Sequence, residues 1–189
     1  MDRLISQRGT KDPGVIETML REYGAVIFRL ALSILHDPAE AQDVVQETFT
    51  QAATALHRYQ VGTNFKAWLF RIAINNCRMS LRRRSARQAL HQAWASLAGL
   101  APRQPDAEAQ VVQAETRHEL WSLVDGLDEK YRMVVLLRLA HNMTIREISQ
   151  VLGVREKTIY TRLYNALARL RVEIQIRPEF VHLLDEVQP

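Results

Sequence analysis

The clearest indication of the fold is one stretch near the C-terminal end, Thr144-Ile-Arg-Glu-Ile-Ser-Gln-Val-Leu-Gly-Val-Arg-Glu-Lys-Thr-Ile-Tyr-Thr-Arg-Leu-Tyr-Asn-Ala-Leu-Ala-Arg-Leu-Arg171. Thr144 and Glu147 have the spacing of a capping box, so a helix begins there. Gly153 allows a tight turn after that helix, Val154 closes the turn, and a second helix follows. This arrangement predicts a helix-turn-helix motif. The apolar residues expected to pack its helices are Ile148, Val151, Leu152, Ile159, Leu163, Ala166, Leu167 and Leu170.

The second helix of this motif leaves polar and basic side chains on its N-terminal half. Residues 143–171 hold six basic and two acidic side chains, a local charge of +4. In helix-turn-helix proteins this half of the second helix meets base edges and phosphates in the major groove. A plain helical hairpin with a glycine turn is the alternative, and the basic face counts against it. The candidate DNA-binding residues are Arg155, Lys157, Thr158, Tyr160, Thr161, Arg162, Tyr164 and Asn165.

A long block in the middle of the chain has no carboxylate. Residues 48–105 contain nine basic residues and no Asp or Glu, whereas residues 1–47 carry a net charge of −3 and residues 106–189 a net charge of −2. The block therefore supplies the whole net charge of +4. Such segregation indicates a surface for a polyanion, because clustered Arg attracts phosphates and nearby carboxylates repel them. Between residues 59 and 78 basic and aromatic residues are mixed, which suits unpaired bases that stack on rings.

Apolar spacing predicts three helices in the first half of the chain, over residues 15–35, 38–57 and 65–85. Asp37 is placed to cap the second helix, with Pro38 at its first position. Residues 60–64 have the composition of a loop, and Asn64 is placed to cap the third helix.

The third helix is expected to have two distinct faces. Its core side is predicted to hold Trp68, Leu69, Ile72 and Met79. Arg71, Asn75, Arg78 and Arg82 follow one another at steps of four, three and four residues, so they form one stripe. A merely solvated face is the alternative, although such a face normally mixes both signs of charge.

The rest of the chain is interpreted from composition and periodicity. Residues 86–114 are rich in Ala, Gln and Pro and predict a flexible linker, with a weak helix near 88–98. Further helices are predicted at 115–126 and 128–141. No alternating strand pattern is present, so the fold class is all-α, with two small helical domains joined by a flexible linker. The expected divisions are a loose leader over 1–14, a first domain over 15–87, a linker over 88–114 and a second domain over 115–189.

Several classes of protein are excluded by what the sequence lacks. The six histidines have no metal-ligand spacing, and neither a phosphate loop nor paired carboxylates in an apolar setting are present. No enzyme, metal site or cofactor is therefore expected. The lone Cys77 excludes an internal disulfide. The polar start lacks the apolar core of a signal peptide and no run is long enough to span a membrane, so we expect a cytoplasmic protein.

Three further stretches carry a specific resemblance to a known family. They are Ala39-Glu-Ala-Gln-Asp-Val-Val-Gln-Glu-Thr-Phe49, Phe65-Lys-Ala-Trp-Leu-Phe-Arg-Ile-Ala-Ile-Asn-Asn76 and Leu127-Asp-Glu-Lys-Tyr-Arg-Met-Val-Val-Leu-Leu-Arg138. With the helix-turn-helix they resemble, in order and spacing, the small extracytoplasmic-function (ECF) class of bacterial sigma factors in the sigma-70 family. The resemblance covers about residues 15–85 (region 2) and 115–171 (region 4). It implies a transcription initiation factor that binds core RNA polymerase, directs it to specific promoters and helps to melt the −10 element.

The resemblance also implies which residues act. The contact with core polymerase maps to Asp43, Gln46 and Glu47, which would meet a basic coiled coil on the β′ subunit; ordinary helix solvation is the alternative. The −10 element would be read by the loop before the third helix and by that helix, with an extruded base entering the loop. Trp68 is expected in the core rather than as a base platform. The implied −10 residues are Tyr59, Asn64, Lys66, Arg71, Asn75, Arg78 and Arg82.

The −35 element would be read by the second helix of the turn motif. Members of the class often carry Arg where this chain has Tyr160 and Asn165. Asn favours adenine whereas Arg favours guanine, so we predict a −35 element that differs from the widespread ECF one. Arg155, Lys157 and Arg162 are assigned to phosphates.

The implied partners are core RNA polymerase (β′ and β subunits), promoter DNA and an anti-sigma factor, often anchored in the inner membrane, that holds the otherwise monomeric chain inactive. The inducing signal stays open among metal excess, envelope stress and iron uptake. Residues 172–189 are expected either to pack on the second domain or to serve a partner. Two rival interpretations remain, a conventional helix-turn-helix repressor or activator and an adaptor that contacts only proteins.

Overall fold

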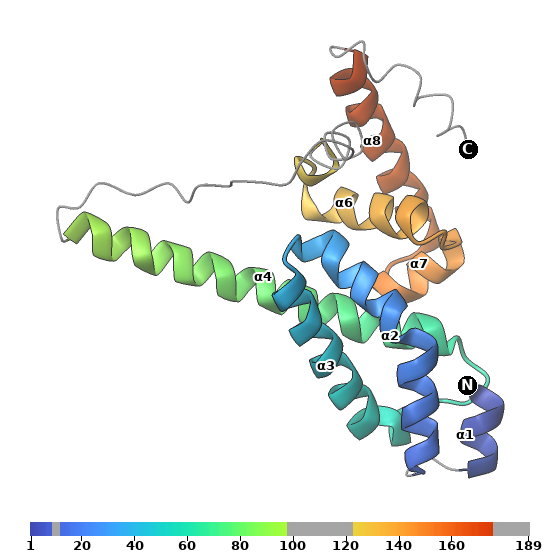
Figure 1. Ribbon diagram of the computed structural model, residues 1–189. Coiled ribbons are helices and arrows are strands. Elements are labelled where there is room, and N and C mark those ends of the chain that lie inside the picture. Colours follow the sequence, from blue (N-terminus) through green and yellow to red (C-terminus); the bar gives the residue numbers. More distant parts are fainter. Residues whose placement is uncertain (9–11, 98–122, 176–189) are drawn as a thin grey trace, which may run out of the picture. The chain divides into compact units, whose positions relative to one another are not determined.

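The computed structural model describes residues 1–8, 12–97 and 123–175 (Figure 1). The chain divides into two compact units, Met1–Gln104 and Pro105–Pro189, and each is described by itself. Every regular element in the described ranges is helical, which confirms the all-α prediction. Most of the predicted linker, most of the predicted helix at 115–126 and the end of the C-terminal extension lie outside the described residues.

Helices α1 (Asp2–Arg8), α2 (Pro13–Leu35), α3 (Pro38–Ala55) and α4 (Phe65–Leu97), with the 3₁₀ turn η1 (Leu56–Arg58), build the first unit. α2 and α3 pack against each other and against α4, and α1 contacts α2. Burial of apolar side chains between these helices provides the main stabilisation. The core includes Met19, Ile27, Leu30, Ile34, Phe49, Leu56, Leu69, Phe70 and Ile74.

The starts of α3 and α4 are set by local capping, as the sequence predicts. Asp37 Oδ1 accepts a hydrogen bond from the backbone N–H of Glu40 at 2.9 Å, and Pro38 occupies the first helical position. Asn64 Oδ1 accepts from the backbone N–H of Ala67 at 3.0 Å. Each cap satisfies a backbone donor that the first turn of a helix leaves without an intrahelical partner.

Two predicted boundaries in this unit are wrong. The expected loose leader contains helix α1, which is anchored because Ile5 is buried. The predicted end of the third helix near residue 85 is too early, since α4 continues to Leu97. Residues 86–97 include four alanines and neither Gly nor Pro, so no residue in that segment stops a helix.

The buried face of α4 differs in part from the prediction. Leu69 is buried as predicted, but Met79 is 47% exposed. At 3.6 residues per turn, Met79 falls on the same flank of the helix as Trp68 and Ile72, which are half-buried. That flank lies at the edge of the core rather than inside it. The residues of α4 that lie fully inside are Leu69, Phe70, Ala73, Ile74 and Cys77.

Helices α6 (Glu129–Val135), α7 (Ile145–Leu152) and α8 (Glu156–Gln175), with the π-helical turn η2 (Leu136–Ala140), build the second unit. They confirm the helix predicted at 128–141 and the helix-turn-helix. α8 packs against both α6 and α7. The core of this unit includes Tyr131, Met133, Val134, Val135, Leu136, Leu137, Ile148, Val151, Ile159 and Ala166.

The turn between α7 and α8 is built by contacts between near neighbours. The Thr144 hydroxyl accepts from the backbone N–H of Glu147 at 3.2 Å, and the Glu147 carboxylate accepts from the backbone N–H of Thr144 at 2.8 Å, which completes the predicted capping box. Gly153 ends α7 with φ of 68°, a left-handed conformation that glycine adopts without a steric cost. The backbone N–H groups of Gly153 and Val154 both donate to the carbonyl of Ser149, at 2.9 and 3.2 Å. Local sequence therefore directs the chain into α8.

Candidate nucleic-acid interface

The predicted basic stripe of α4 lies on the side of the helix opposite its buried residues. Arg71, Asn75 and Arg82 are exposed, and Arg78 is half-buried. Their spacing keeps all four on one side, whereas Ala73 and its neighbours face the core. The structure thus brings these four predicted residues together on a surface that a phosphate backbone can reach.

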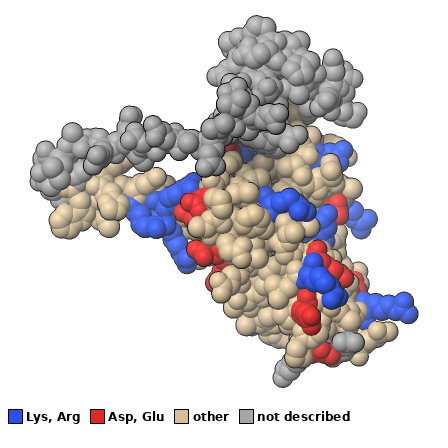
Figure 2. Space-filling view, in the orientation of Figure 1, with Lys and Arg blue, Asp and Glu red and all other residues tan. Residues whose placement is uncertain are grey.

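One carboxylate from α3 lies close to the arginines that follow the stripe. Glu40 Oε2 accepts a hydrogen bond from Ser80 Oγ at 2.9 Å, and the Glu40 carboxylate lies 3.9 Å from Arg84 Nη1 and 4.0 Å from Arg87 Nη2. Arg84 Nη1 also donates to the carbonyl of Leu35 at 3.1 Å. Figure 2 shows acidic side chains beside the arginines on this part of α4. An anion near Arg84 and Arg87 therefore meets less net positive charge than their number suggests.

A cluster of four aromatic rings supports the loop at residues 59–64. Phe65 contacts the rings of Tyr23, Tyr59 and Trp68, with centroid distances of 5.6, 5.2 and 5.4 Å. Tyr59 also contacts Trp68 at 5.3 Å. Tilted and edge-on pairs at these distances are favourable beyond the area that they bury. Trp68 therefore supports the loop from the edge of the core, since it is half-buried rather than inside the core as predicted.

Tyr59 is placed differently from the other predicted −10 residues, because its ring is inside the cluster. It is only 7% exposed, and burial raises the pKa of Tyr59 to about 12. Its hydroxyl lies 2.7 Å from Asp2 Oδ1 and 2.8 Å from the carbonyl of Thr63. The structure therefore does not present the Tyr59 ring to a nucleic acid, and the residue holds the loop from within.

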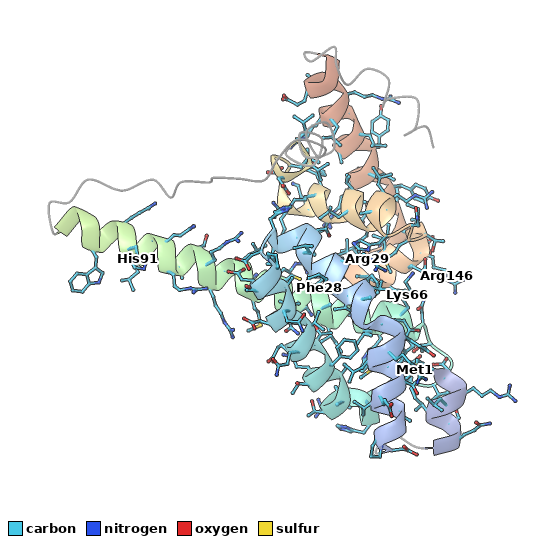
Figure 3. The ribbon with its side chains drawn as sticks, in the orientation of Figure 1. Met1, Phe28, Arg29, Lys66, His91 and Arg146 are labelled. Atoms are coloured by element: carbon cyan, nitrogen blue, oxygen red, sulfur yellow. The ribbon has the colours of Figure 1, made fainter. Side chains whose placement is uncertain are left out.

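Two more predicted −10 residues lie at the start of α4. The Asn64 side chain is engaged in the helix cap, and Lys66 is half-buried with its ammonium 5.6 Å from the centre of the Phe70 ring. Figure 3 marks Lys66 at the beginning of this helix. The structure therefore shows the Lys66 ammonium next to the Phe70 ring rather than next to the loop.

The three polar residues predicted to face the polymerase share one exposed side of α3. Asp43, Gln46 and Glu47 are exposed, and Glu47 Oε1 accepts a hydrogen bond from Gln51 Nε2. Spacings of three and four residues place them next to one another on the helix surface. The structure therefore presents these three side chains as one polar patch, while Val44 and its neighbours face the core.

The N-terminal half of α8 is the second candidate surface. Arg155, Lys157 and Thr161 are exposed, and Tyr160 and Tyr164 place large aromatic rings in solvent, Tyr164 with 75% of its surface exposed. The remaining three predicted residues are half-buried on the flanks of the same face, namely Thr158, Arg162 and Asn165. Five of the eight predicted residues are therefore exposed and three are half-buried, and Arg155 lies in the turn just before α8.

The C-terminal half of α8 is fixed to the rest of its unit. Arg169 Nη1 lies 3.1 Å from Asp128 Oδ2, and its guanidinium stacks over the Tyr131 ring at 4.6 Å. A cation over an aromatic face is attracted by the electron density of the ring. These contacts join the C-terminal half of α8 to the start of α6.

Other kinds of site find no support in the described residues. No group of three or more potential metal ligands occurs there, and no helix there is long and apolar enough to cross a membrane. Cys77 is fully buried, and burial raises the pKa of its thiol to about 12. It is therefore a poor nucleophile at neutral pH.

Comparison with known families agrees with this division into two units. The family described as Sigma-70 region 2 matches residues 19–87, and the family described as Sigma-70, region 4 matches residues 117–170. Together these matches cover more than half of the chain. The chain belongs to the sigma-70 family.

Relatives identify this sigma factor as a member of the ECF class. RNA polymerase sigma factor CnrH of Cupriavidus metallidurans is 30% identical over 175 residues, which cover 89% of this chain and 92% of CnrH. ECF RNA polymerase sigma factor SigW of Bacillus subtilis is 26% identical over 159 residues, covering 81% of this chain and 85% of SigW.

Two solved sigma-factor structures are also similar. CnrH in complex with the cytosolic domain of CnrY has a TM-score of 0.67 and 25% identity, covering 93% of this chain and 97% of that chain. The sigma factor RpoE from Bartonella quintana, solved with the anti-sigma factor NepR, shares the fold with a TM-score of 0.61 and 20% identity, covering 85% of this chain and 97% of that one. The family resemblance inferred from the motifs is confirmed.

Sequence reasoning missed the contribution of helix α1 to this sigma factor. Asp2 reaches the loop at residues 59–64, where its carboxylate accepts hydrogen bonds from the Tyr59 hydroxyl and from the backbone N–H of Gly62, the latter at 3.1 Å. The partners are 57 and 60 residues away along the chain, so no local pattern could indicate the contact.

Proposed function

We propose that this sigma factor binds core RNA polymerase, directs it to a specific set of promoters and helps to open their −10 elements. The observation that carries the proposal is the presence of two exposed surfaces of different kinds on one chain. α4 and its loop suit a single strand, whereas α8 follows a tight turn and suits the major groove of a duplex. The polymerase supplies the catalysis, and we propose no catalytic residue in this chain.

The −10 element is opened by capture of the single strand. A base that leaves the stack loses a few kcal/mol of stacking and pairing, which the protein must offset. We assign the phosphates of the captured strand to Arg71, Arg78 and Arg82, with Asn75 among them to contact a base edge. Lys66 and the loop at residues 59–64 form the place where the unpaired base is held, and Tyr59 supports that loop from inside.

The −35 element is read by α8 in duplex form. Arg155, Lys157 and Arg162 are assigned to phosphates, which position the helix without reading sequence. Tyr160, Thr161, Tyr164 and Asn165, with Thr158 at the flank, are assigned to base edges. Asn165 in particular favours adenine through its paired donor and acceptor.

The polar patch of α3 is the proposed contact with the polymerase. Asp43, Gln46 and Glu47 combine two carboxylates with an amide on an otherwise uncovered side of the helix. A basic coiled coil on the β′ subunit is complementary to that patch in charge, and such complementarity speeds association and favours the correct orientation.

We further propose that an anti-sigma factor holds this protein inactive, and that this partner is anchored in the inner membrane. The support is the 30% identity to CnrH, whose solved complex contains the cytosolic domain of CnrY. An inhibitor that binds the free sigma factor competes with core polymerase by mass action. The sigma factor itself would then be cytoplasmic and reach the membrane only through its partner.

The test is transcription from a genomic promoter library by core RNA polymerase with and without the purified chain, followed by sequencing of the transcript starts. We expect new starts that share one pair of −35 and −10 sequences. Binding to duplex DNA without polymerase, together with no new starts, would instead favour a conventional helix-turn-helix repressor or activator.

A charge reversal tests the polymerase contact separately, through the affinity of the purified chain for core RNA polymerase. Asp43→Lys is expected to weaken binding to core polymerase about tenfold, because it places a cation against a basic partner. Glu17→Lys is the matched control, since Glu17 is an exposed acid on α2 rather than α3. Equal loss in both variants would refute the assignment of the patch.

A further inference from the structure

The carboxylate of Asp2 joins two points of the loop that precedes α4. Its Oδ1 lies 2.7 Å from the Tyr59 hydroxyl, and its Oδ2 accepts from the backbone N–H of Gly62 at 3.1 Å. The single phenol proton can go to Asp2 or to the carbonyl of Thr63, and the charged carboxylate is the stronger acceptor. One side chain from the first turn of α1 thus holds both the aromatic support and the backbone of the loop.

Asp2 is itself held in place by its helix. Ile5 of α1 is 3% exposed, and its backbone N–H donates to the carbonyl of Met1 at 3.0 Å. α1 also contacts α2, which belongs to the core of the unit. In Figure 3, Met1 lies beside the loop that leads to Lys66. The carboxylate therefore reaches the loop from a fixed support.

Within the described residues, the aromatic cluster supports the two ends of the loop, whereas its middle is held by few contacts from other helices. Its remaining hydrogen bonds are local, with the Thr63 backbone and hydroxyl both donating to the carbonyl of Gln60, at 3.2 and 2.7 Å. Gly62 has φ of 90°, and Val61 is half exposed. Such a segment needs a fixed external contact to keep one conformation, because ordering each backbone residue costs roughly 1 to 2 kcal/mol of entropy.

We propose that Asp2 is a positioning residue for −10 recognition, which holds the loop at residues 59–64 in the conformation that receives an unpaired base. The inference rests on the function proposed above and adds a residue outside both DNA-binding surfaces. A carboxylate repels phosphates, and hydrogen bonds do not remove its charge, so a favourable effect of Asp2 on promoter opening has to come through the geometry of the loop. Both of its oxygens accept hydrogen bonds from that loop.

The test compares the rate of promoter opening by holoenzyme on two templates. One is a promoter that the wild-type protein opens, and the other carries a single base change in its −10 element. Asp2→Ala is expected to slow opening of the first about tenfold, the effect of losing a charge-assisted hydrogen bond, and to reduce the ratio between the two templates. Tyr59→Phe should reduce the same ratio, and the effects of the two substitutions should be less than additive in the double variant, because both remove the hydrogen bond between the Tyr59 hydroxyl and Asp2.

Asp12→Asn is the matched control. It removes the same charge near the same end of the chain, and Asn still caps α2, whose N-terminal Gly14 N–H donates to Asp12 at 2.7 Å. If Asp2 only stabilises the fold, Asp2→Ala lowers the fraction of active protein. Opening of both templates then slows by the same factor, and the ratio of the two opening rates stays unchanged. That result would overturn the proposal. If Asp2 only repels DNA, Asp2→Ala should open the promoter as fast as the wild type or faster. That result would also overturn the proposal. Absence of new starts with wild-type protein would refute the sigma-factor function itself, which distinguishes the two failures.

Discussion

Gly62→Ala is expected to destabilise the first unit although the added methyl group meets no obstacle. No heavy atom lies within 4 Å of a Cβ built at Gly62, but the residue has φ of 90°. A left-handed backbone costs a residue other than glycine about 1 to 2 kcal/mol, while alanine regains about 0.5 to 1 kcal/mol by restricting the unfolded chain. The expected net loss is therefore about 1 kcal/mol.

Gly24→Ala is the matched control for this prediction. A Cβ at Gly24 also meets nothing within 4 Å, and the residue lies inside α2 without a positive φ. Alanine there should stabilise the unit by about 0.5 to 1 kcal/mol, because glycine is a poor helix former. The same chemical change should therefore shift stability in opposite directions at the two positions, by about 2 kcal/mol in total.

Urea denaturation followed by the fluorescence of Trp68 measures this difference. Trp68 lies in the aromatic cluster, and replacing the other two tryptophans, Trp94 and Trp121, by phenylalanine leaves it as the sole indole. With a slope of about 2 kcal/mol per molar urea, the two midpoints should differ by about 1 M. Equal midpoints, or a lower midpoint for Gly24→Ala, would refute the argument that backbone conformation controls the loop.

Three other predictions concern single residues. Lys157→Gln should weaken binding to a −35 duplex similarly for all sequences and lower the slope of log affinity against log salt by about 1; Lys130→Gln, which alters a lysine over the Tyr131 ring, should leave that slope unchanged. Asn165→Arg should change the preferred base at one −35 position from adenine to guanine, and selection from randomised −35 DNA that yields the wild-type motif would contradict the assignment. Burial raises the pKa of Cys77 from 9.0 to about 12. Above pH 9 the thiol ionises in the unfolded chain but not in the folded one, so the free energy of unfolding falls as the pH rises towards 12. The decrease is at most about 1.4 kcal/mol per pH unit. Cys77→Ala should therefore show a flatter decline of unfolding free energy between pH 8 and 10 than the wild type, and parallel declines would be evidence against this linkage.

Features that depend on near neighbours were predictable from the sequence. Asp37 and Asn64 each cap a helix through a backbone N–H three residues ahead, and Thr144 pairs with Glu147 across the same interval. The geometry of the first helical turn fixes the number of residues between a capping side chain and its partner, so a cap can be recognised from the sequence alone. The same reasoning explains why the exposed stripe of α4 was placed correctly.

Features that depend on distant partners were not predictable in this way. Tyr59 follows a basic residue and precedes a loop, and a tyrosine in that setting can either stack on a base or be buried. The contacts of its ring with Phe65 and Trp68 show that it is buried. Met79 has the spacing of a core residue, but it falls on the edge of α4 that α2 and α3 do not cover. Asp2 pairs with a tyrosine 57 residues away, which no periodic pattern contains.

The burial of Cys77 has a practical consequence for studying the two halves of the protein together. It is the single cysteine of the chain, it is fully buried, and burial raises the pKa of its thiol to about 12, so very little of it is the reactive thiolate at neutral pH. Alkylating dyes and thiol-reactive spin labels should therefore not react with Cys77 in the native state. A cysteine introduced at an exposed site on α4 and another on α8 could then be labelled without removing the natural one. Distances between such labels, in the free chain and in holoenzyme, would report how the two units are arranged in each state.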